Sequence, residues 1–327
     1  MRFILSLLSL IMLTNLYAQP KPYADQLAHT FSIVARDAST GEMAVAVQSH
    51  WFSVGSVVAW GKSGVGVVAT QSFVNPAYGP EGLALMEQGI SAQAALQQLL
   101  KKDSGKAVRQ VAFIDVNGDV AAHTGERCIV YAGHTTGDNF SVQANMMLND
   151  AVVPAMEAAF KNHAHLPLPE RVMAVLAAAQ QAGGDIRGKQ SAALLVVGGT
   201  KTEAIWQDKK IDLRVEDHQN PIQELQRLLK VYRAYEFMNQ GDVAMEHDQV
   251  DEALDLYAKA EALLRGNLEP SFWKAVSLWN SGEQQEATKI FKTIFKQEDN
   301  WRLLLLRLPE SGLINREVEA LKNMARQ

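Results

Sequence analysis

The sequence predicts an α+β domain in which two β-sheets lie between layers of helices, followed by a domain built only of helices. Three observations favour this fold class. Strand-like patterns, either alternating or uniformly apolar, occur at the beginning, in the middle and at the end of the region before Pro221. Two pairs of segments with helical spacing separate these groups of strands, and only helical spacing remains after Pro221. This order indicates helical layers on both sides of the sheets.

The first 18 residues are expected to be a signal peptide. A single arginine follows the first methionine, an apolar run covers 3–13, and Ala18 precedes Gln19-Pro20. The run is shorter than the roughly 20 residues that a membrane-spanning helix needs, although an uncleaved anchor remains the alternative. The protein is therefore expected to be secreted or periplasmic, with a leader segment over 19–29 and no membrane span after cleavage.

The elements of the first domain, expected over 30–225, follow in order. The first strands are expected at 31–35, 43–47, 57–60 and 65–69. Two helices are expected between 80 and 100, broken at Gly89, and then a hairpin over 108–123 around Asn117-Gly118. Further strands are expected near 129–131 and 140–144, helices at 150–162 and 169–182, and last strands at 191–197, 204–206 and 211–215.

The second domain, expected over 226–327, contains an internal repeat. The segment 251–260 has an echo at 285–294, and both place Ala, an aliphatic residue and an aromatic residue on one helical face. The offset of 34 residues resembles that of tetratricopeptide repeats, although an unrelated helical hairpin remains the alternative. The helices of this tail show apolar faces and no cluster of titratable groups, so its removal is expected to leave the first domain folded.

Composition and motifs exclude several classes of protein. Of the 327 residues 47% are apolar and 20% are charged, with one cysteine, which excludes a disordered chain, a collagen-like fibre and a disulfide scaffold. A net charge of −5 argues against nucleic acid as a partner. Gly61-Lys62-Ser63 lacks the first glycine and the helix of a phosphate loop, and 115–119 lacks the last ligand of a calcium loop. We therefore expect no cofactor and no metal.

The first domain carries many polar residues at predicted strand ends and in loops next to glycine, where active sites are usually built. Each of them alone is more often a satisfied residue in a loop or at the end of a sheet. Together they indicate a site in the first domain, drawn from Gln48, Thr70, Gln71, Arg109, Gln110, His134, Asn139, Gln143, Asn145, Asp185, Arg187 and Gln190.

Several of these motifs resemble those of the DUF1028 family. The resemblance covers about 30–229 and rests on Thr30-Phe31-Ser32-Ile33-Val34-Ala35-Arg36-Asp37, Val68-Ala69-Thr70-Gln71, Asn75-Pro76, Tyr78-Gly79, Arg109-Gln110-Val111, Gly133-His134, Gly183-Gly184-Asp185-Ile186-Arg187-Gly188 and Asp212-Leu213-Arg214-Val215. The family is grouped with the N-terminal nucleophile (Ntn) hydrolases, and the resemblance therefore implies a four-layer αββα sandwich.

The resemblance also implies a catalytic chemistry. In Ntn hydrolases the side chain of an N-terminal Thr, Ser or Cys attacks a carbonyl while its own α-amine accepts the proton. The matching position is Thr30, and a cut after His29 is required to expose its amine. The sequence departs from the pattern at Val54-Gly55-Ser56, where proteasome-type relatives carry a lysine, and at Gln143-Ala144-Asn145, where the family usually has glycine in the middle. Arg109 or Arg187 is then expected to stabilise charge.

These expectations combine into two functional hypotheses. The first is an exported amidohydrolase that acts on a small amide or peptide-like substrate, with Thr30 as nucleophile and the backbone near Gln71 and Ser72 as oxyanion hole. Its binding or supporting residues would be Gln48, Thr70, Gln71, Asn75, Tyr78, Arg109, His134, Asn139, Asn145, Asp185, Arg187 and Gln190. The second is a catalytically silent scaffold whose helical tail docks a protein partner. A homodimer is expected by analogy with related folds.

Overall fold

The structure is a computed structural model that describes residues 26–28 and 30–326 of the chain. The chain divides into two compact units between Leu225 and Gln226. The expected signal peptide and most of the expected leader lie outside the described residues. Within the described residues, no helix combines the length and the apolar character needed to cross a membrane.

One antiparallel sheet of the first unit contains the strand that begins at Thr30. Its strand order is β11-β10-β3-β2-β9-β8, and the strands are β2 (Thr30–Arg36), β3 (Met43–Ser49), β8 (Gly133–Gly137), β9 (Phe140–Ala144), β10 (Ser191–Val197) and β11 (Lys209–Val215). All residues of β3, β9 and β10 are buried, as expected for strands rich in Val, Ala and Leu that are covered on both faces. The head of β2 therefore lies in the middle of a covered sheet.

The second antiparallel sheet is built around β5 (Gly66–Val74). One edge of β5 pairs with β6 (Arg109–Asp115), which in turn pairs with β7 (Val120–Thr124). The other edge pairs first with β4 (Ala59–Lys62) and then with β1 (Gln26–Ala28). The chain thus leaves this sheet after Ala28 and enters the other sheet at Thr30.

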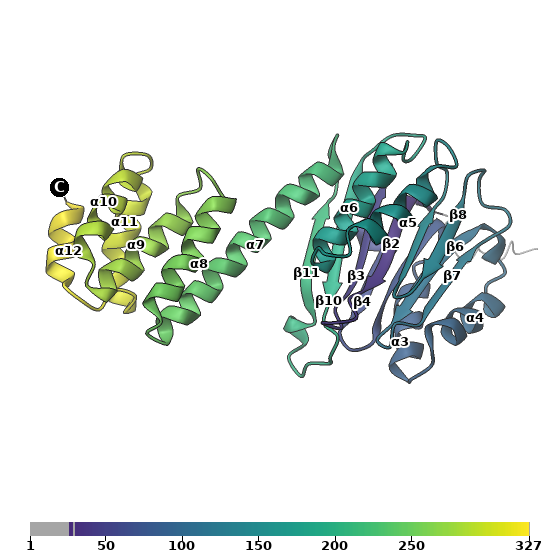
Figure 1. The fold of residues 1–327 in the computed structure, drawn as a ribbon, viewed down its shortest axis with the longest axis horizontal. Helices are drawn as coiled ribbons and strands as arrows, with labels where there is room; N and C mark the ends of the chain where they lie inside the picture. Colours follow the sequence, from purple (N-terminus) through teal and green to yellow (C-terminus); the bar gives the residue numbers. More distant parts are fainter. Residues whose placement is uncertain (1–25, 29, 327) are drawn as a thin grey trace, which may run out of the picture. The chain divides into compact units, whose positions relative to one another are not determined.

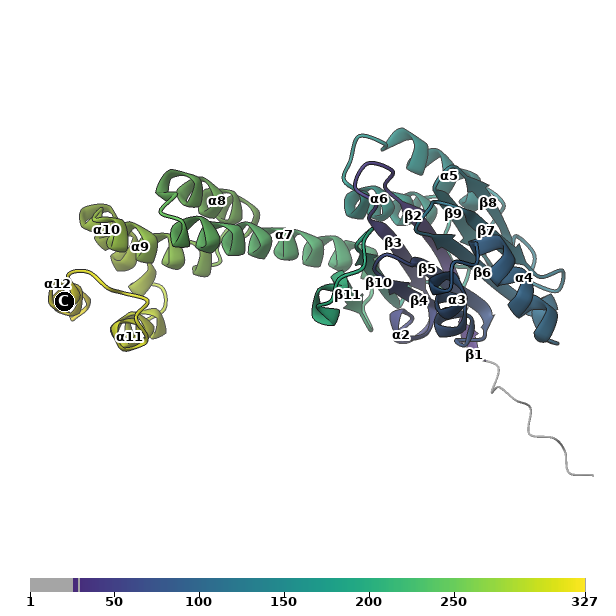
Figure 2. The ribbon, with the colours of Figure 1, turned by 90° about the horizontal axis from the view of Figure 1, so that it is seen from below.

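The two sheets face each other, and helices cover their outer faces (Figures 1 and 2). Helices α3 (Tyr78–Glu87) and α4 (Ala92–Lys102) pack on β5, β6 and β7, while α5 (Val152–Asn162) and α6 (Leu168–Gln181) pack on the sheet that contains β2. Between the sheets lies an apolar core that includes Val34, Val45, Val67, Ala112 and Leu195. In each strand, every second residue counted from these positions also points its side chain between the sheets. The remaining side chains point to the helices.

Close packing in the first unit depends on small residues in α3. A Cβ at Gly79 would lie 2.3 Å from the Cγ of Trp60, and one at Gly82 would lie 2.5 Å from the Cζ of Phe113. No larger side chain fits at either position without movement of an aromatic ring. The two glycines therefore fix how closely α3 approaches the sheet.

Three expected strands differ in the structure. Residues 55–58 form a short helix, α2 (Gly55–Val58), before β4 begins, and 205–207 form a 3₁₀ helix. Residues 129–131 form an exposed loop instead of a strand, because Tyr131 adopts a φ of 67°, which is outside the extended region. A further 3₁₀ turn, η1 (Lys106–Val108), precedes β6.

The second unit is entirely helical within the residues that the structure describes. Its helices are α7 (Pro221–Glu246), α8 (Val250–Leu263), α9 (Glu269–Ser281), α10 (Gln284–Phe295), α11 (Asn300–Arg307), η3 (Leu308–Ser311) and α12 (Val318–Ala325). The two repeated segments lie in α8 and α10, and each of these helices packs against α9. Tyr257 and Phe291, the aromatic residues of the repeat, are both buried. The boundary between the units falls inside α7.

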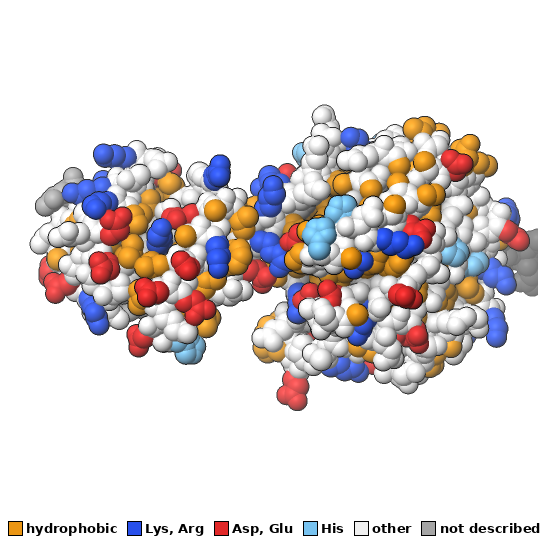
Figure 3. Space-filling model, in the orientation of Figure 1, with side chains coloured by type: hydrophobic (Ala, Val, Ile, Leu, Met, Phe, Trp, Pro, Cys, Tyr) orange, Lys and Arg blue, Asp and Glu red, His pale blue; other side chains and the backbone are white. Residues whose placement is uncertain are grey.

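The surface carries charges of both signs. On the face shown in Figure 3, Lys and Arg side chains alternate with Asp and Glu side chains over both units. This distribution agrees with the small net charge of the sequence.

Candidate functional site

The polar residues that the sequence singled out gather mostly at one end of the two sheets. At this end β2 begins, β3 ends and β10 begins, because Ser49 pairs with both Thr30 and Ser191. The end of β9 lies beside the head of β2 through the pairing of Phe31 with Ala144. Hydrogen bonds between the sheets bring the corresponding ends of β5 and β6 to the same place. We call this region the Thr30 end.

A network of uncharged side chains fills the space between the sheets at the Thr30 end. The hydroxyl of Ser32 donates to Gln71 Oε1 (2.6 Å), and Gln71 Nε2 donates to Gln110 Oε1 (2.7 Å). Gln143 Nε2 donates to the hydroxyl of Ser32 (2.7 Å), and Ser141 donates to Gln143 Oε1 (2.9 Å). All five side chains are fully buried, so each bond replaces one that water would have made. The network joins the two sheets.

Thr30 is held at the edge of this network. Its backbone N–H donates to Asn145 Oδ1 (3.2 Å), and its carbonyl accepts from the backbone N–H of Asn145 (3.0 Å) and from Gln71 Nε2 (3.3 Å). Asn145 Nδ2 donates in turn to Gln110 Oε1 (2.8 Å). Thr30 is fully buried, and by strand parity its side chain faces the other sheet, as Ser32 does.

The network reaches the surface at His134. Gln110 Nε2 is shared between Thr124 Oγ1, Gly133 O and Ala144 O, at 2.9 to 3.0 Å. Thr124 Oγ1 lies 2.8 Å from His134 Nδ1. Burial, with a smaller contribution from the charge of His123, lowers the pKa of His134 below its ordinary value of 6.5. The imidazole is therefore neutral at pH 7, as are the amides and hydroxyls linked to it.

Backbone strain is concentrated at the same end. Ser53, Ser72, Tyr131 and Met146 all adopt left-handed φ angles between 54° and 73°, which non-glycine residues rarely do. Ser72 lies within β5, near its end, and the other three residues follow or precede strands that meet at the Thr30 end. Such conformations persist where the surrounding structure imposes them, and they cluster at functional sites.

Arg109 and Tyr78 lie on the opposite face of their sheet from Thr30. Arg109 Nε pairs with Asp103 Oδ2 (3.0 Å), Arg109 Nη1 donates to Phe73 O (2.5 Å), and the hydroxyl of Tyr78 donates to Asp103 Oδ2 (3.1 Å). Burial opposes the charge of Asp103, but the hydrogen bonds from Arg109 and Gly105 outweigh it and lower its pKa. The structure thus assigns Arg109 to an ion pair under α3 and α4.

Thr70 and Asn75 belong to the same helix-covered face. The hydroxyl of Thr70 donates to Asn75 O (3.0 Å), and Asn75 Oδ1 accepts from the N–H of Ala77 (3.1 Å). These bonds close the turn that leads from β5 into α3. Both side chains therefore shape a turn and are not directed at Thr30.

Asp185 and Arg187 form a second polar group at the Thr30 end. Arg187 donates through Nε (3.0 Å) and Nη2 (2.7 Å) to the two carboxylate oxygens of Asp185, which also accepts from the N–H of His50 (3.2 Å). The backbone N–H of Gln190 donates to Ser49 O (3.0 Å) at the same end of the sheet. Both prongs of the Arg187 guanidinium thus bind the carboxylate of Asp185, which is the arrangement of a structural ion pair.

Gln48 and Asn139 have different surroundings. The side chain of Gln48 is fully buried beside Phe31, and its amide nitrogen and oxygen have no hydrogen-bond partner among the residues described. Asn139 lies in the turn between β8 and β9, at the far end of the sheet, where it accepts from Arg36 Nη1 (3.2 Å). Asn139 is thus distant from Thr30.

Sequence reasoning left Ser32, Ser141 and Thr124 out of the site. A signal for Ser32 and Ser141 exists, because each has the parity that points between the sheets and each stands between two apolar residues of its strand. Their convergence with Gln71 and Gln110 depends on how the two sheets are aligned, which no local pattern encodes.

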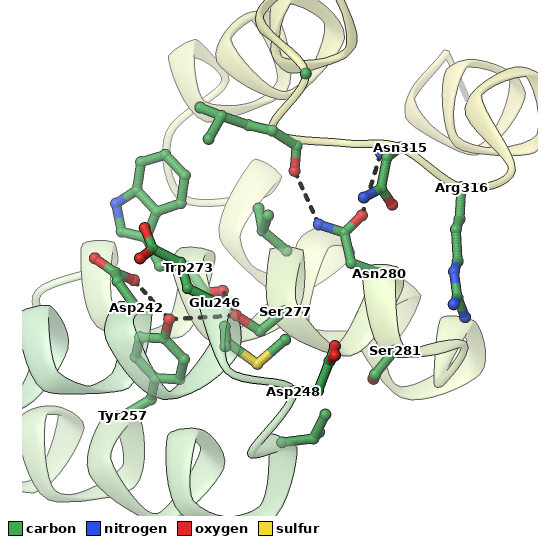
Figure 4. Close-up of a pocket in the computed structure, with 15 residues that line it drawn as sticks. Asp242, Glu246, Asp248, Tyr257, Trp273, Ser277, Asn280, Ser281, Asn315 and Arg316 are labelled. Carbon is green, nitrogen blue, oxygen red and sulfur yellow. Dashed lines mark hydrogen bonds between the residues drawn. The ribbon is translucent and has the colours of Figure 1, made fainter.

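The helical unit contains a pocket of its own, of about 660 Å³ (Figure 4). Three acidic side chains, Asp242, Glu246 and Asp248, line it together with Trp273 and with Arg316 on the other side. Burial and the charge of Glu246 raise the pKa of Asp242, although its carboxylate accepts a hydrogen bond from Tyr257 (2.6 Å). The expectation that the tail has no cluster of titratable groups was therefore wrong: Asp242 and Glu246 lie about one turn apart on α7 and Asp248 follows two residues later, so this cluster is local in the sequence.

Comparisons with known proteins place the first unit in a family. A family model described as "Family of unknown function (DUF1028)" matches residues 30–225. A crystal structure of protein SPO2555 from Silicibacter pomeroyi, itself assigned to DUF1028, is similar with a TM-score of 0.56 and 31% sequence identity, over 62% of this chain and 88% of that one. No curated protein matches the sequence. Because the family model covers more than half of the chain, the protein belongs to the DUF1028 family, whose function is unknown.

Proposed function

We propose that the protein is an exported Ntn-type amidohydrolase whose nucleophile is Thr30, exposed by a cut between residues 29 and 30. One observation carries the proposal: the backbone nitrogen of Thr30 is held by Asn145 Oδ1 at 3.2 Å, at the head of a central strand and at the edge of a buried amide network. After the cut this nitrogen would be an α-amine in a fixed position. The two facing sheets with helices on their outer faces fit the αββα sandwich that Ntn hydrolases share.

The chemistry follows from that position. A free α-amine has a pKa of about 8, so at neutral to mildly alkaline pH a useful fraction is unprotonated and can accept a proton. Asn145 Oδ1 would accept one amine hydrogen and orient the lone pair toward the hydroxyl of Thr30. The amine takes the hydroxyl proton as the oxygen bonds to the substrate's carbonyl carbon, and it gives that proton to the leaving nitrogen when the C–N bond breaks. Water then hydrolyses the resulting ester by the same route.

The strained backbone supports an oxyanion hole near Gln71 and Ser72. A left-handed φ of 73° at Ser72 interrupts the regular direction of successive N–H groups at the end of β5. Donors with an imposed direction are what a developing oxyanion requires. Gln71 Nε2 is already committed to Thr30 O and to Gln110, so this role would fall to backbone N–H groups.

Mass spectrometry of the secreted protein tests the proposal. We expect the wild-type chain to begin at Thr30, Thr30→Ser to be cut and partly active, and Thr30→Ala to retain the leader, because one hydroxyl would serve both maturation and turnover. Thr136→Ala, at an exposed strand position, is the matched control and should be processed normally. A homogeneous, folded wild-type protein that begins at Gln19 would refute the proposal.

A second candidate function is a silent scaffold whose tetratricopeptide-like tail docks a protein partner. Two observations favour it: Thr30 is fully buried, and the helical unit carries an acidic pocket that the chemistry at Thr30 does not need. A retained leader together with partner binding that Glu246→Gln weakens would select this candidate.

A further inference from the structure

The described part of the leader, Gln26–Ala28, pairs with the first unit. Strand β1 pairs antiparallel with the last residues of β5, with Gln26 opposite Val74, Leu27 opposite Phe73 and Ala28 opposite Ser72. On this side of β5, the pairing with β4 covers only 66–69. Among the described strands, the leader is therefore what pairs with residues 72–74 on this side. We call these three residues the β5 edge.

We propose that the β5 edge is a binding site for the acyl side of an extended peptide substrate, and that the leader is its covalently attached occupant. That the bound peptide is a substrate rests on the proposed function, whereas the pairing of β1 with the β5 edge is independent of it. The ligand class follows from the mode of binding, since an unpaired strand edge binds an extended peptide backbone through its N–H and C=O groups.

The register determines where a bound peptide would be cut. Ala28 lies opposite Ser72, and one residue separates it from Thr30. A peptide seated in the same register would direct its C-terminal end toward Thr30 in the same way. The scissile carbonyl would then belong to the residue that follows the one opposite Ser72.

The energetics indicate that the site opens when the leader is cut. Three paired residues contribute only a few backbone hydrogen bonds, each worth about 0.5–1.5 kcal/mol net. Association of two separate molecules costs at least about 4 kcal/mol, which these bonds scarcely offset. The attached leader does not pay this cost, because its effective concentration is in the millimolar range. Once cut, the leader loses this advantage and binds only as a weak, exchangeable peptide, so that a substrate peptide in excess can replace it.

The surroundings of the β5 edge favour apolar side chains. The hydroxyl of Ser72 lies 3.7 Å from the sulfur of Cys128, and Cys128 is followed by an exposed apolar loop of Ile129, Val130 and Tyr131. Val130 is 71% exposed, which is unusual for its type beside a buried polar network. The leader itself places Leu27 and Ala28 on this edge. We therefore expect the substrate to carry small or branched apolar residues here.

Peptide binding to uncut full-length chains tests this site separately from catalysis. The probe is a fluorescein-labelled copy of residues 21–29 with a C-terminal amide, and every protein carries Thr30→Ala so that hydrolysis plays no part. In one variant Leu27→Pro and Ala28→Pro remove two consecutive N–H groups, so that the leader loses its pairing whichever of the two points at β5. We expect this variant to bind the probe at least about tenfold more tightly than the chain with a paired leader.

Methylation of the probe backbone identifies strand addition. Antiparallel pairing uses the N–H groups of alternate residues, so N-methylation at the position of Leu27 and N-methylation at the positions of Gln26 and Ala28 should have opposite outcomes. One probe should lose binding and the other should keep it. Equal effects of the two probes, equal binding to both chains, or no binding to the Pro-Pro variant would each overturn the site. Normal maturation at Thr30 in the wild type would still leave the proposed function intact.

Discussion

Asp103→Asn should destabilise the first unit strongly while leaving its shape almost unchanged. The carboxylate of Asp103 is 10% exposed and the Arg109 side chain 4% exposed, so solvent screens their 3.0 Å ion pair only weakly. Removal of one member of such a pair costs about 3–5 kcal/mol, because the remaining charge stays buried. Tyr78 loses its charged acceptor as well. Hydrogen exchange of the β6 amides reports on this unit alone, and it should become roughly 100-fold faster or more, since 1.4 kcal/mol corresponds to a factor of ten.

A surface ion pair provides the control. Glu157→Gln removes the partner of Lys161 in α5, where the side chains are 30% and 61% exposed, and should change stability by about 0.3–0.5 kcal/mol.

The pH dependence gives a second test. The pKa of Asp103 is lowered, so the contribution of its charge to the stability of the folded state is complete above the ordinary carboxyl value of 3.8 and is lost only as the pH falls below it. The difference between wild type and Asp103→Asn should therefore be constant from pH 7 to pH 5. A change as small as that of the control would refute the reasoning.

Three further predictions concern other parts of the chain. Arg187→Lys should lower the stability of the first unit by about 1 kcal/mol, through loss of the two-pronged contact with Asp185, and leave maturation unchanged; failed maturation at normal stability would instead place Arg187 in the reaction. Gly82→Ala should cost about 1–3 kcal/mol in thermal unfolding, because its Cβ would meet Phe113 at 2.5 Å, and an unchanged melting temperature would contradict this. A chain that ends at Leu225 should remain monodisperse and folded by circular dichroism, and aggregation would show that the helical unit supports the first one.

Local pattern predicted the elements whose signal is local. The strands near 31–35 and 43–47 and the hairpin around Asn117-Gly118 appear in the structure close to their expected bounds, because alternation and turn chemistry act within a few residues. Residues 129–131 predict a strand, because three apolar residues in a row are usually buried, but they form an exposed loop. Their exposure depends on the surface around them in the folded protein, which the local sequence does not encode.

The contacts among the candidate site residues were only partly predictable. Positions at strand ends predicted that Gln71, Asn145 and His134 lie near one another, and the structure brings these three residues together at the Thr30 end. Arg109 and Gln110 are neighbours in the sequence and were both predicted to belong to the site. Their side chains point to opposite faces of β6, as the alternation of side chains along a strand requires. Which side chains meet across the two sheets depends on the alignment of strands far apart in the chain.

The distances along the sequence also determine when the surroundings of Thr30 come into existence during synthesis. The backbone nitrogen of Thr30 donates to Asn145, which lies 115 positions later in the chain. The carbonyl of Thr30 accepts from Gln71, which lies 41 positions later. A nascent chain that has not yet released Asn145 therefore has no such site, whatever the state of its leader. A ribosome-bound fragment that ends before Asn145 accordingly cannot assemble the geometry at Thr30.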